Sequence, residues 1–273
     1  MGQARCRLRA EVLVSEKRDL PRLLVISAHA ADFCSRAGGV IIKYVKRGSP
    51  VRVVELSVGE RGESDEVWLE QPGITLAQVQ EIRKREAERA AAQMGAEIRF
   101  HNWLDHPLTM NEERLVALVE EIREMRADIL LTHHHSDPLN VDHEYVAKAV
   151  TEACCLAQFQ GLETRFPRTP SPALFFFEPT IPMTDLTGFK PNLYIDITDV
   201  FDLKMQALRE FKSQSILPAA YERYALWRGS QAKTMSGNRN IQYAEAFEQY
   251  LPSVANEFPL SGRYYAISKY LNR

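Results

Sequence analysis

The chain has 273 residues, and its 34 Lys and Arg residues nearly balance its 36 Asp and Glu residues, leaving a formal net charge of -2. This balance provides no basic surface for nucleic acid or for an anionic membrane, so we expect neither as a partner. No apolar run approaches the ~18 residues needed to span a bilayer. We therefore expect a cytoplasmic protein whose 4 cysteines stay reduced.

Short apolar runs alternate with longer helical segments along most of the chain. The basic residues 1–21 carry no hydrophobic leader and predict an N-terminal extension, so we assign one catalytic domain to residues 22–273. In chain order the pattern predicts a strand at 22–28, a helix from Gly38 to Gly48, a strand at 51–58, a helix at 75–94, a strand at 97–103, a helix at 110–126, a strand at 127–134, a helix at 142–157, strands at 173–179 and 192–198, and a helix at 200–214. This order predicts an α/β fold, a Rossmann-like and mostly parallel sheet with helices on both faces.

Polar residues follow four of the predicted strands directly. In open α/β sheets the ligand site lies outside the carboxyl ends of the strands, where such residues meet. They are His29 and Asp32 after the first strand, Glu60 to Glu63 after the second, Asp105 and His106 after the third, and His133 to His135, Asn140 and His143 after the fourth. The sequence therefore predicts a catalytic site at this edge of the sheet.

Three of these residues form a plausible ligand set for a metal ion. His29 and Asp32 lie three positions apart at a strand-to-helix turn, and His143 lies at the start of a later helix. Two imidazoles and one carboxylate suit Zn²⁺, and also accept Fe²⁺, Co²⁺ or Mn²⁺. Three protein ligands with an open position are typical of a catalytic rather than a structural site.

Four segments carry a resemblance to a known family. The sequences LLVISAHAADFCSRAGG, VELSVGERGES, RKREAERAAAQMG and NVDH resemble the LmbE/PIG-L family of zinc-dependent N-deacetylases, from Arg22 to at least Gln214, and YAEAF follows at 243–247. In that family the His and the second Asp of AHPDDE and the final His of HPDH bind zinc. The resemblance therefore implies that His29, Asp32 and His143 are zinc ligands and that the fold is PIG-L/LmbE-like.

The departures from the family pattern change the expected reaction. The first Asp of AHPDDE is the general base of the deacetylases, and Ala31 stands there; Asn140 replaces the first His of HPDH. Loss of a general base typically costs about 10²–10⁴-fold in rate. The chain is more similar to a branch that hydrates 4-oxalomesaconate (4-carboxy-2-hydroxymuconate) in aromatic-compound degradation. This resemblance implies a metal-dependent hydratase that adds water to a C=C bond of an unsaturated keto or enol polycarboxylic acid.

The chemistry of such a substrate suggests further site residues. We expect Glu63 of the GERGES loop to act as the base, although it has a simpler interpretation as an ion-pair partner of Arg61. A polycarboxylate needs cationic and polar partners, and we expect these to be Arg36, Arg61, Arg83, Asn140 and Arg239. Arg83 has the alternative of pairing with Glu86 along its own helix.

One position departs from the hydratase pattern. We expect that branch to carry a proton-transferring histidine shortly after FFEP, where this chain has Thr180, so His106 or His135 would have to move the second proton. Two other functions stay open. One is an amide hydrolase with a relocated base, and the other is a non-catalytic protein that binds a metal and an anionic metabolite. Family members often self-associate, which implies a homo-oligomer.

Overall fold

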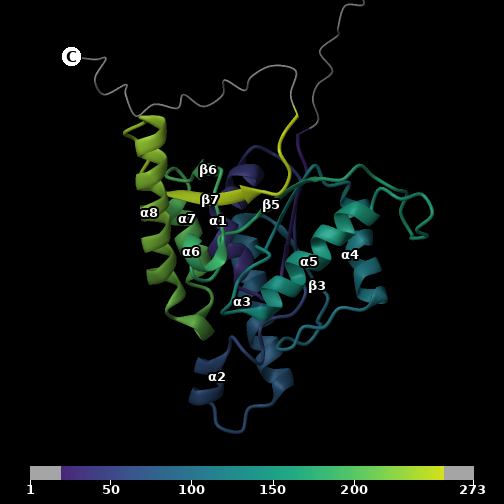
Figure 1. Cartoon of the computed structure of the whole chain (residues 1–273). Helices are drawn as coiled ribbons and strands as arrows, with labels where there is room; N and C mark the ends of the chain where they lie inside the picture. Colours follow the sequence, from purple (N-terminus) through teal and green to yellow (C-terminus); the bar gives the residue numbers. More distant parts are fainter. Residues whose placement is uncertain (1–19, 255–273) are drawn as a thin grey trace, which may run out of the picture.

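The computed structural model describes residues 20–254, which fold around one sheet (Figure 1). Its strands are β1 (Leu23–Ser27), β2 (Val51–Glu55), β3 (Glu97–Phe100), β4 (Ile129–Thr132), β5 (Ala173–Phe176), β6 (Leu193–Asp196) and β7 (Ala244–Gln249). Its helices are α1 (Asp32–Lys46), α2 (Asp65–Glu70), α3 (Leu76–Met94), α4 (Glu112–Met125), α5 (Val141–Leu156), α6 (Thr184–Thr187), α7 (Phe201–Leu208), the 3₁₀ turn η1 (Lys212–Gln214) and α8 (Leu217–Ser236).

The sheet has the order β3-β2-β1-β4-β5-β7-β6. Neighbouring strands from β3 to β5 pair in parallel, whereas β7 runs antiparallel to both β5 and β6. The chain leaves β1 towards β2 on one side and returns to β4 on the other. This reversal beside β1 creates a crevice at the carboxyl ends of the strands, which is where such sheets bind ligands.

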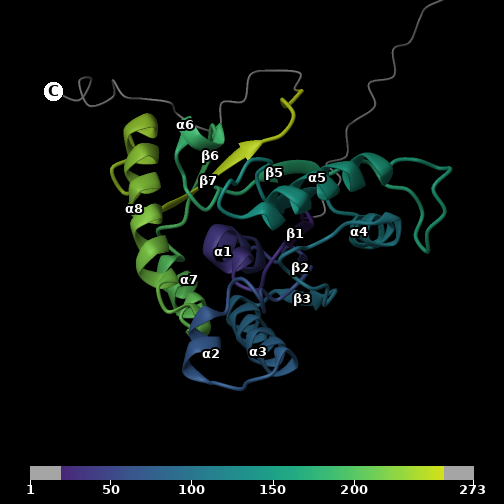
Figure 2. The same cartoon turned by 60° about the horizontal axis from the view of Figure 1, so that its bottom comes forward.

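Alternate residues of β1 supply the two cores of the domain. Leu23 and Val25 pack with α1, α3 and α7 on one face, and Leu24 and Ile26 pack with α4 and α5 on the other. Figure 2 shows these two groups of helices on opposite sides of the sheet. A strand buried on both faces is expected to be continuously apolar, as LLVIS is. The predicted α/β class and the mostly parallel sheet are confirmed.

Several boundaries differ from the predicted ones. Helix α1 begins at Asp32, six residues before the predicted start at Gly38. The strands after the first end earlier than predicted, and α2, α8 and β7 were not predicted as elements at all. Helix α8 exposes Leu226 and Trp227, so its sequence lacks a clear apolar stripe. The YAEAF segment supplies most of β7, where the charged Glu245 interrupts the apolar pattern of a buried strand.

The domain boundaries lie partly outside the described residues. The predicted extension at 1–21 falls almost entirely in residues that the structure does not describe, and so does the end of the predicted domain after residue 254. The division into 1–21 and 22–273 therefore stays a prediction. Among the described helices, none is both long and apolar enough to cross a membrane.

Candidate metal centre

His29 and Asp32 lie at the turn between β1 and α1. His29 follows the strand by two residues, and its backbone N–H donates to Asp32 Oδ2 at 2.9 Å, which fixes the carboxylate beside it. Asp32 is the first residue of α1, where the positive end of the helix dipole favours a negative charge. The His29 Nδ1 atom lies 3.4 Å from Asp32 Oδ2. Both residues are buried.

His143 reaches the same carboxylate from the first turn of α5. Its Nε2 atom lies 3.4 Å from Asp32 Oδ2. Together with Glu63, these residues offer four donor atoms that all lie within 4.8 Å of one another. We call His29, Asp32, Glu63 and His143 the cage. The structure thus brings together the three predicted ligands, although their role as ligands stays a prediction.

The two cage histidines are oriented as metal ligands need to be. His29 Nε2 lies 3.2 Å from Asp142 Oδ2, and His143 Nδ1 lies 2.8 Å from Asp137 Oδ2. A carboxylate on the outer nitrogen fixes the tautomer, so that the other nitrogen can bind a metal. The inner atoms, His29 Nδ1 and His143 Nε2, are buried and have no hydrogen-bond partner among the described residues. A divalent ion fits this set of donors.

Glu63 enters the cage from the loop between β2 and α2. Its Oε1 atom lies 3.1 Å from His29 Nδ1 and accepts a hydrogen bond from Asn140 Nδ2 at 2.9 Å. Its Oε2 atom accepts a hydrogen bond from Gln214 Nε2 at 3.4 Å. The side chain keeps an exposed fraction of 15%, whereas the Asp32 side chain has 5%. Glu63 is therefore the cage carboxylate most open to a substrate.

The charges within the site oppose the effect of burial on its carboxyl groups. Burial raises the pKa of Glu63, but the charge of His29 and the hydrogen bond between the two residues outweigh it and hold that pKa at about 2. This lowering requires a protonated His29, and the charge that causes it is absent when His29 is neutral, as a metal ligand has to be. Burial, with the charge of His143, lowers the pKa of His133 to about 3. His133 also accepts a hydrogen bond at Nε2 from the backbone N–H of Ala28. It is thus a neutral ring that packs behind the cage.

Two predicted substrate residues, Arg36 and Arg83, are buried beside the cage. The Arg36 guanidinium lies 3.4 Å from Asp32 Oδ1 and donates to Tyr221 Oη at 2.7 Å. Arg83 donates from Nε to the Val58 carbonyl at 2.9 Å. Its Nη2 atom has no hydrogen-bond partner among the described residues and lies 3.9 Å from Glu63 Oε2. Each arginine thus supplies a positive charge next to one cage carboxylate.

The other predicted substrate residues are placed differently. Asn140 directly precedes α5, and its side chain donates to Glu63 rather than capping the helix, so it does lie at the cage. Arg61 is exposed, and its backbone N–H and guanidinium are tied to Asp105. Arg239 is exposed in the loop between α8 and β7, and no hydrogen bond or ion pair joins it to another described residue. Neither Arg61 nor Arg239 contacts a cage side chain.

The sequence analysis did not assign the correct contacts to several residues at the site. Asp142 contacts His29 rather than its chain neighbour His143, and the residue that orients His143 is Asp137. Thr180 donates from both N and Oγ1 to Asp137 and accepts a hydrogen bond from Arg36, so it belongs to the support of His143. The HHHSDPLN segment was the signal that could have pointed to Asp137.

His106 lies at the mouth of the site. Its ring stacks on His29 with centroids 5.3 Å apart, and its side chain keeps an exposed fraction of 33%. Its Nδ1 atom lies 3.5 Å from Asp142 Oδ2. A Cβ atom on Gly62 would lie 1.8 Å from the His106 ring, so a larger residue at that position of the GERGES loop would displace this ring. His135 is exposed and contacts His134 and Phe176 rather than the cage.

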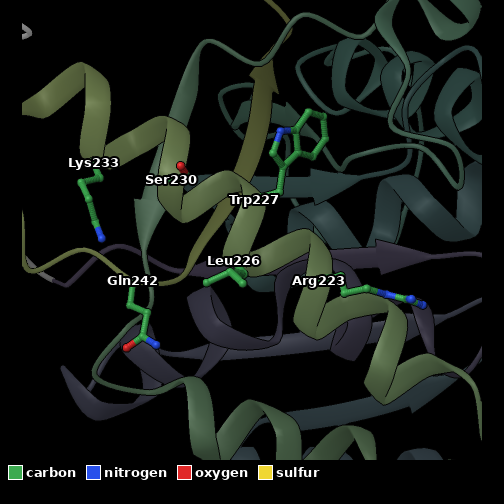
Figure 3. A pocket seen from close by; sticks show the side chains of 6 residues that line it. All are labelled: Arg223, Leu226, Trp227, Ser230, Lys233 and Gln242. Atoms are coloured by element: carbon green, nitrogen blue, oxygen red, sulfur yellow. The ribbon is translucent and has the colours of Figure 1, made fainter.

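A surface hollow lies away from the cage. A cavity of about 440 Å³ opens along α8, and Figure 3 shows Leu226 and Gln242 at its lining, with Arg223 and Lys233 towards its two ends. None of its lining residues belongs to the cage or contacts a cage side chain. This hollow therefore has no part in the chemistry of the metal centre.

Comparison with known proteins agrees with this geometry. Residues 24–154 match the family model PIG-L, described as GlcNAc-PI de-N-acetylase. The chain is 37% identical over 234 residues to the 4-oxalmesaconate hydratase of Pseudomonas putida, covering 85% of this chain and 90% of that protein. It is 29% identical to a diacetylchitobiose deacetylase of Thermococcus kodakarensis, over 72% of this chain and 71% of the relative. The crystal structure of the P. putida 4-carboxy-2-hydroxymuconate hydratase has a TM-score of 0.83 and 35% identity, covering 88% of this chain and all 100% of that one.

Proposed function

Because the chain belongs to the PIG-L family, we propose that it is a metal-dependent hydratase that adds water to a C=C bond of an unsaturated keto or enol polycarboxylic acid. The proposed substrate is 4-carboxy-2-hydroxymuconate (4-oxalomesaconate), an intermediate of aromatic-compound degradation in the cytoplasm. The observation that carries the proposal is a cage that keeps two oriented histidines and a carboxylate while Ala31 stands beside Asp32. The similarity in sequence and in structure to a hydratase of P. putida over most of the chain supports it.

His29, Asp32 and His143 would hold the metal ion, and zinc is the ion we propose. A bound divalent ion supplies Lewis acidity, which stabilises negative charge that develops on a substrate oxygen during the reaction. Arg36 and Arg83 would balance further negative charge on the substrate, because each is buried and lies within 4 Å of a cage carboxylate. The free Nη2 of Arg83 is the better placed of the two to donate to a substrate carboxylate.

Glu63 would act as the base of the hydration. Its carboxylate accepts a proton from water, the resulting hydroxide bonds to one carbon of the double bond, and the π electrons move to the neighbouring carbon. Asn140 and Gln214 orient Glu63 for this step through hydrogen bonds to its two oxygens. Glu63 then returns its proton to solvent.

The second carbon also needs a proton. Of the two histidines that the sequence left open, we propose His106, since its ring stacks on His29 and is one-third exposed at the mouth of the site. His135 has no contact with the cage. The proton given up by His106 is restored from solvent, so the net reaction is the addition of one water molecule.

The proposal is tested by adding zinc-loaded protein to 4-carboxy-2-hydroxymuconate and following the loss of its conjugated-diene absorbance. We expect rapid bleaching that chelator-treated protein does not produce. Zinc-loaded protein that leaves the absorbance unchanged would refute the named substrate. The same assay with His106→Asn and His135→Asn should show a large loss for the first variant alone, and an equal loss for both would refute the role of His106.

An amide hydrolase is the second candidate, because the family model and one relative are named for removing acetyl groups from nitrogen. The Ala31→Asp variant distinguishes the two reactions. We expect it to abolish hydration, because a buried carboxylate is added beside Asp32. A gain of amide hydrolysis by this variant would favour the hydrolase. Metal binding without turnover of either substrate class would favour a non-catalytic, metabolite-binding protein.

A further inference from the structure

A buried ion pair contacts the backbone of α1 about one turn after Asp32. The Lys204 Nζ atom, from α7, lies 2.8 Å from Glu245 Oε1, from β7. The exposed fractions of the two side chains are 2% and 3%. Neither residue touches the cage, so the proposed chemistry does not explain why two charges are buried here.

The pair contacts the backbone of α1 at both ends of one helical hydrogen bond. In an α-helix the N–H of Gly39 is the natural partner of the Ser35 carbonyl. Here Lys204 Nζ donates to the Ser35 carbonyl at 2.7 Å, and Glu245 Oε1 accepts from the Gly39 N–H at 2.8 Å. Glu245 Oε2 also accepts from the Val40 N–H at 2.8 Å. The pair therefore ties three backbone groups of α1 to α7 and β7.

Two glycines allow this contact. A Cβ atom on Gly39 would lie 2.6 Å from Ile197 Cγ2, and one on Gly38 would lie 3.2 Å from Lys204 Cγ. A larger residue at Gly39 would therefore displace Ile197, which follows β6, and one at Gly38 would shift the Lys204 side chain slightly. The RAGG and YAEAF segments, which lie about 200 residues apart, thus form a single joint between α1 and the antiparallel strand.

We propose that Lys204 and Glu245 are positioning residues that hold the first turn of α1 in the direction that the cage needs. The inference rests on the metal centre of the proposed function. That turn carries Asp32 and Arg36, and Asp32 Oδ2 lies 3.4 Å from His143 Nε2. The pair holds Ser35, Gly39 and Val40 of α1 against α7 and β7, so without it the adjoining first turn, with Asp32, is less firmly placed relative to His143.

This role differs from simple stabilisation of the fold. Replacing both partners of a buried ion pair by apolar groups is often neutral or stabilising, because the cost of burying the charges disappears. Removing only one partner leaves an unpaired charge and is destabilising. A double variant therefore separates the two effects: its fold should persist while its metal centre is distorted.

The test compares cobalt binding in two double variants of the full chain. For Lys204→Met with Glu245→Leu, we expect Co²⁺ affinity, measured against a competing chelator, to fall about 10- to 100-fold, the range seen when residues that orient metal ligands are replaced. The visible absorption of bound Co²⁺ should also change, because it depends on ligand geometry. Thermal unfolding of the metal-free protein should change little.

The matched control is Lys43→Met with Asp199→Leu. This exposed pair, with 2.6 Å between Nζ and Oδ1, also joins α1 to the segment before α7, but it touches no backbone group of the first turn. We expect it to leave Co²⁺ affinity and absorption unchanged. A folded Lys204/Glu245 double variant with the affinity and spectrum of the wild type would overturn the proposal.

A second variant guards against failure to fold. Lys204→Gln with Glu245→Gln removes both charges but keeps groups that can donate and accept hydrogen bonds, and we expect a smaller loss of Co²⁺ affinity from it. Failure of both variants to fold would also overturn the proposal, because the pair would then be needed for folding itself. Since no substrate is used, a wild-type protein that binds cobalt but hydrates nothing would refute the proposed function and leave this test intact.

Discussion

The molecule holds two dense clusters of charge, and they are built in opposite ways. One is the cage with its supporting carboxylates at the ends of β1 and β4. The other, which we call the α4 network, lies between the sheet and α4 and consists of Arg52, Glu97, Arg99, Glu121 and Glu124. In the α4 network each of the three carboxylates lies within 3.4 Å of both guanidiniums. Two guanidiniums thus face three carboxylates, and a single excess negative charge remains at the partly exposed edge of the sheet.

The metal centre does not balance its own charge. Four carboxylates lie within 3.4 Å of a ring nitrogen of His29 or His143, namely Asp32, Glu63, Asp137 and Asp142. Among residues 20–254, only two guanidiniums lie within 4 Å of any of them, those of Arg36 and Arg83, and Arg83 also lies 3.6 Å from the buried Glu86. With neutral imidazoles, at least two negative charges remain. A divalent cation would balance two of them. The residues of this cluster therefore suit a bound cation, whereas those of the α4 network pair with one another.

The largest expected effect comes from removing a cage histidine. We expect His29→Ala and His143→Ala to lose stoichiometric metal, because each removes one of three protein ligands. His101→Ala, beside the α4 network, is the control and should keep its metal. Metal content after gel filtration is the measurement. Full occupancy in both cage variants would refute the ligand assignment.

Removing the metal should destabilise the whole protein. A ligand present at 100 times its Kd stabilises the native state by about 2.7 kcal/mol, and each kcal/mol corresponds to roughly 2–4 °C in Tm for a domain of this size. We therefore expect chelator to lower Tm by about 5–10 °C in a thermal-unfolding scan, and added zinc to restore it. An unchanged Tm would mean that the two excess negative charges need no cation.

A smaller effect is expected in the α4 network. We predict that Arg99→Met lowers the free energy of unfolding by less than about 1 kcal/mol, since its side chain is 35% exposed and its ion pairs are screened. Metal content should not change. Denaturant unfolding at low and high salt provides the measurement. A loss of metal in this variant would show that the two clusters are coupled.

The smallest expected effect is the pH dependence of the stability that Arg99 contributes to the folded protein. Hydrogen bonds from Arg99 lower the pKa of Glu124 against a weaker opposing effect of burial. A carboxyl group whose pKa is lower in the folded state stabilises the protein above its unfolded pKa of about 4.3. The stability difference between wild type and Arg99→Met should therefore be constant above about pH 5 and shrink as the pH falls below 4.3. A difference that grows in acid would contradict this assignment.

The parts of the molecule that could be predicted from the sequence are those set by local pattern. The apolar run LLVIS predicts a strand buried on both faces, and the residues after it fall at the edge where such sheets bind ligands. His29, Asp32 and His143 follow from this rule. The start of α1 at Asp32 did not, because the helical pattern becomes clear only after the two glycines.

Contacts between distant segments could not be predicted. Whether Asp137 or Asp142 orients His143 depends on ring direction, which spacing along the chain does not determine. Gln214 reaches Glu63 from a 3₁₀ turn 151 residues away, and Tyr221 reaches Arg36 across 185 residues. The charged Glu245 also concealed β7, since a buried strand is expected to be apolar.

The most direct test of the account is a joint measurement of metal content and hydration rate in Glu63→Gln. Glu63 lies within the cage, so it has to be either the base or a ligand. We predict full metal occupancy and a rate that is about 10²- to 10⁴-fold lower, as for the loss of a general base. Full occupancy with an unchanged rate, or loss of the metal, would contradict the account.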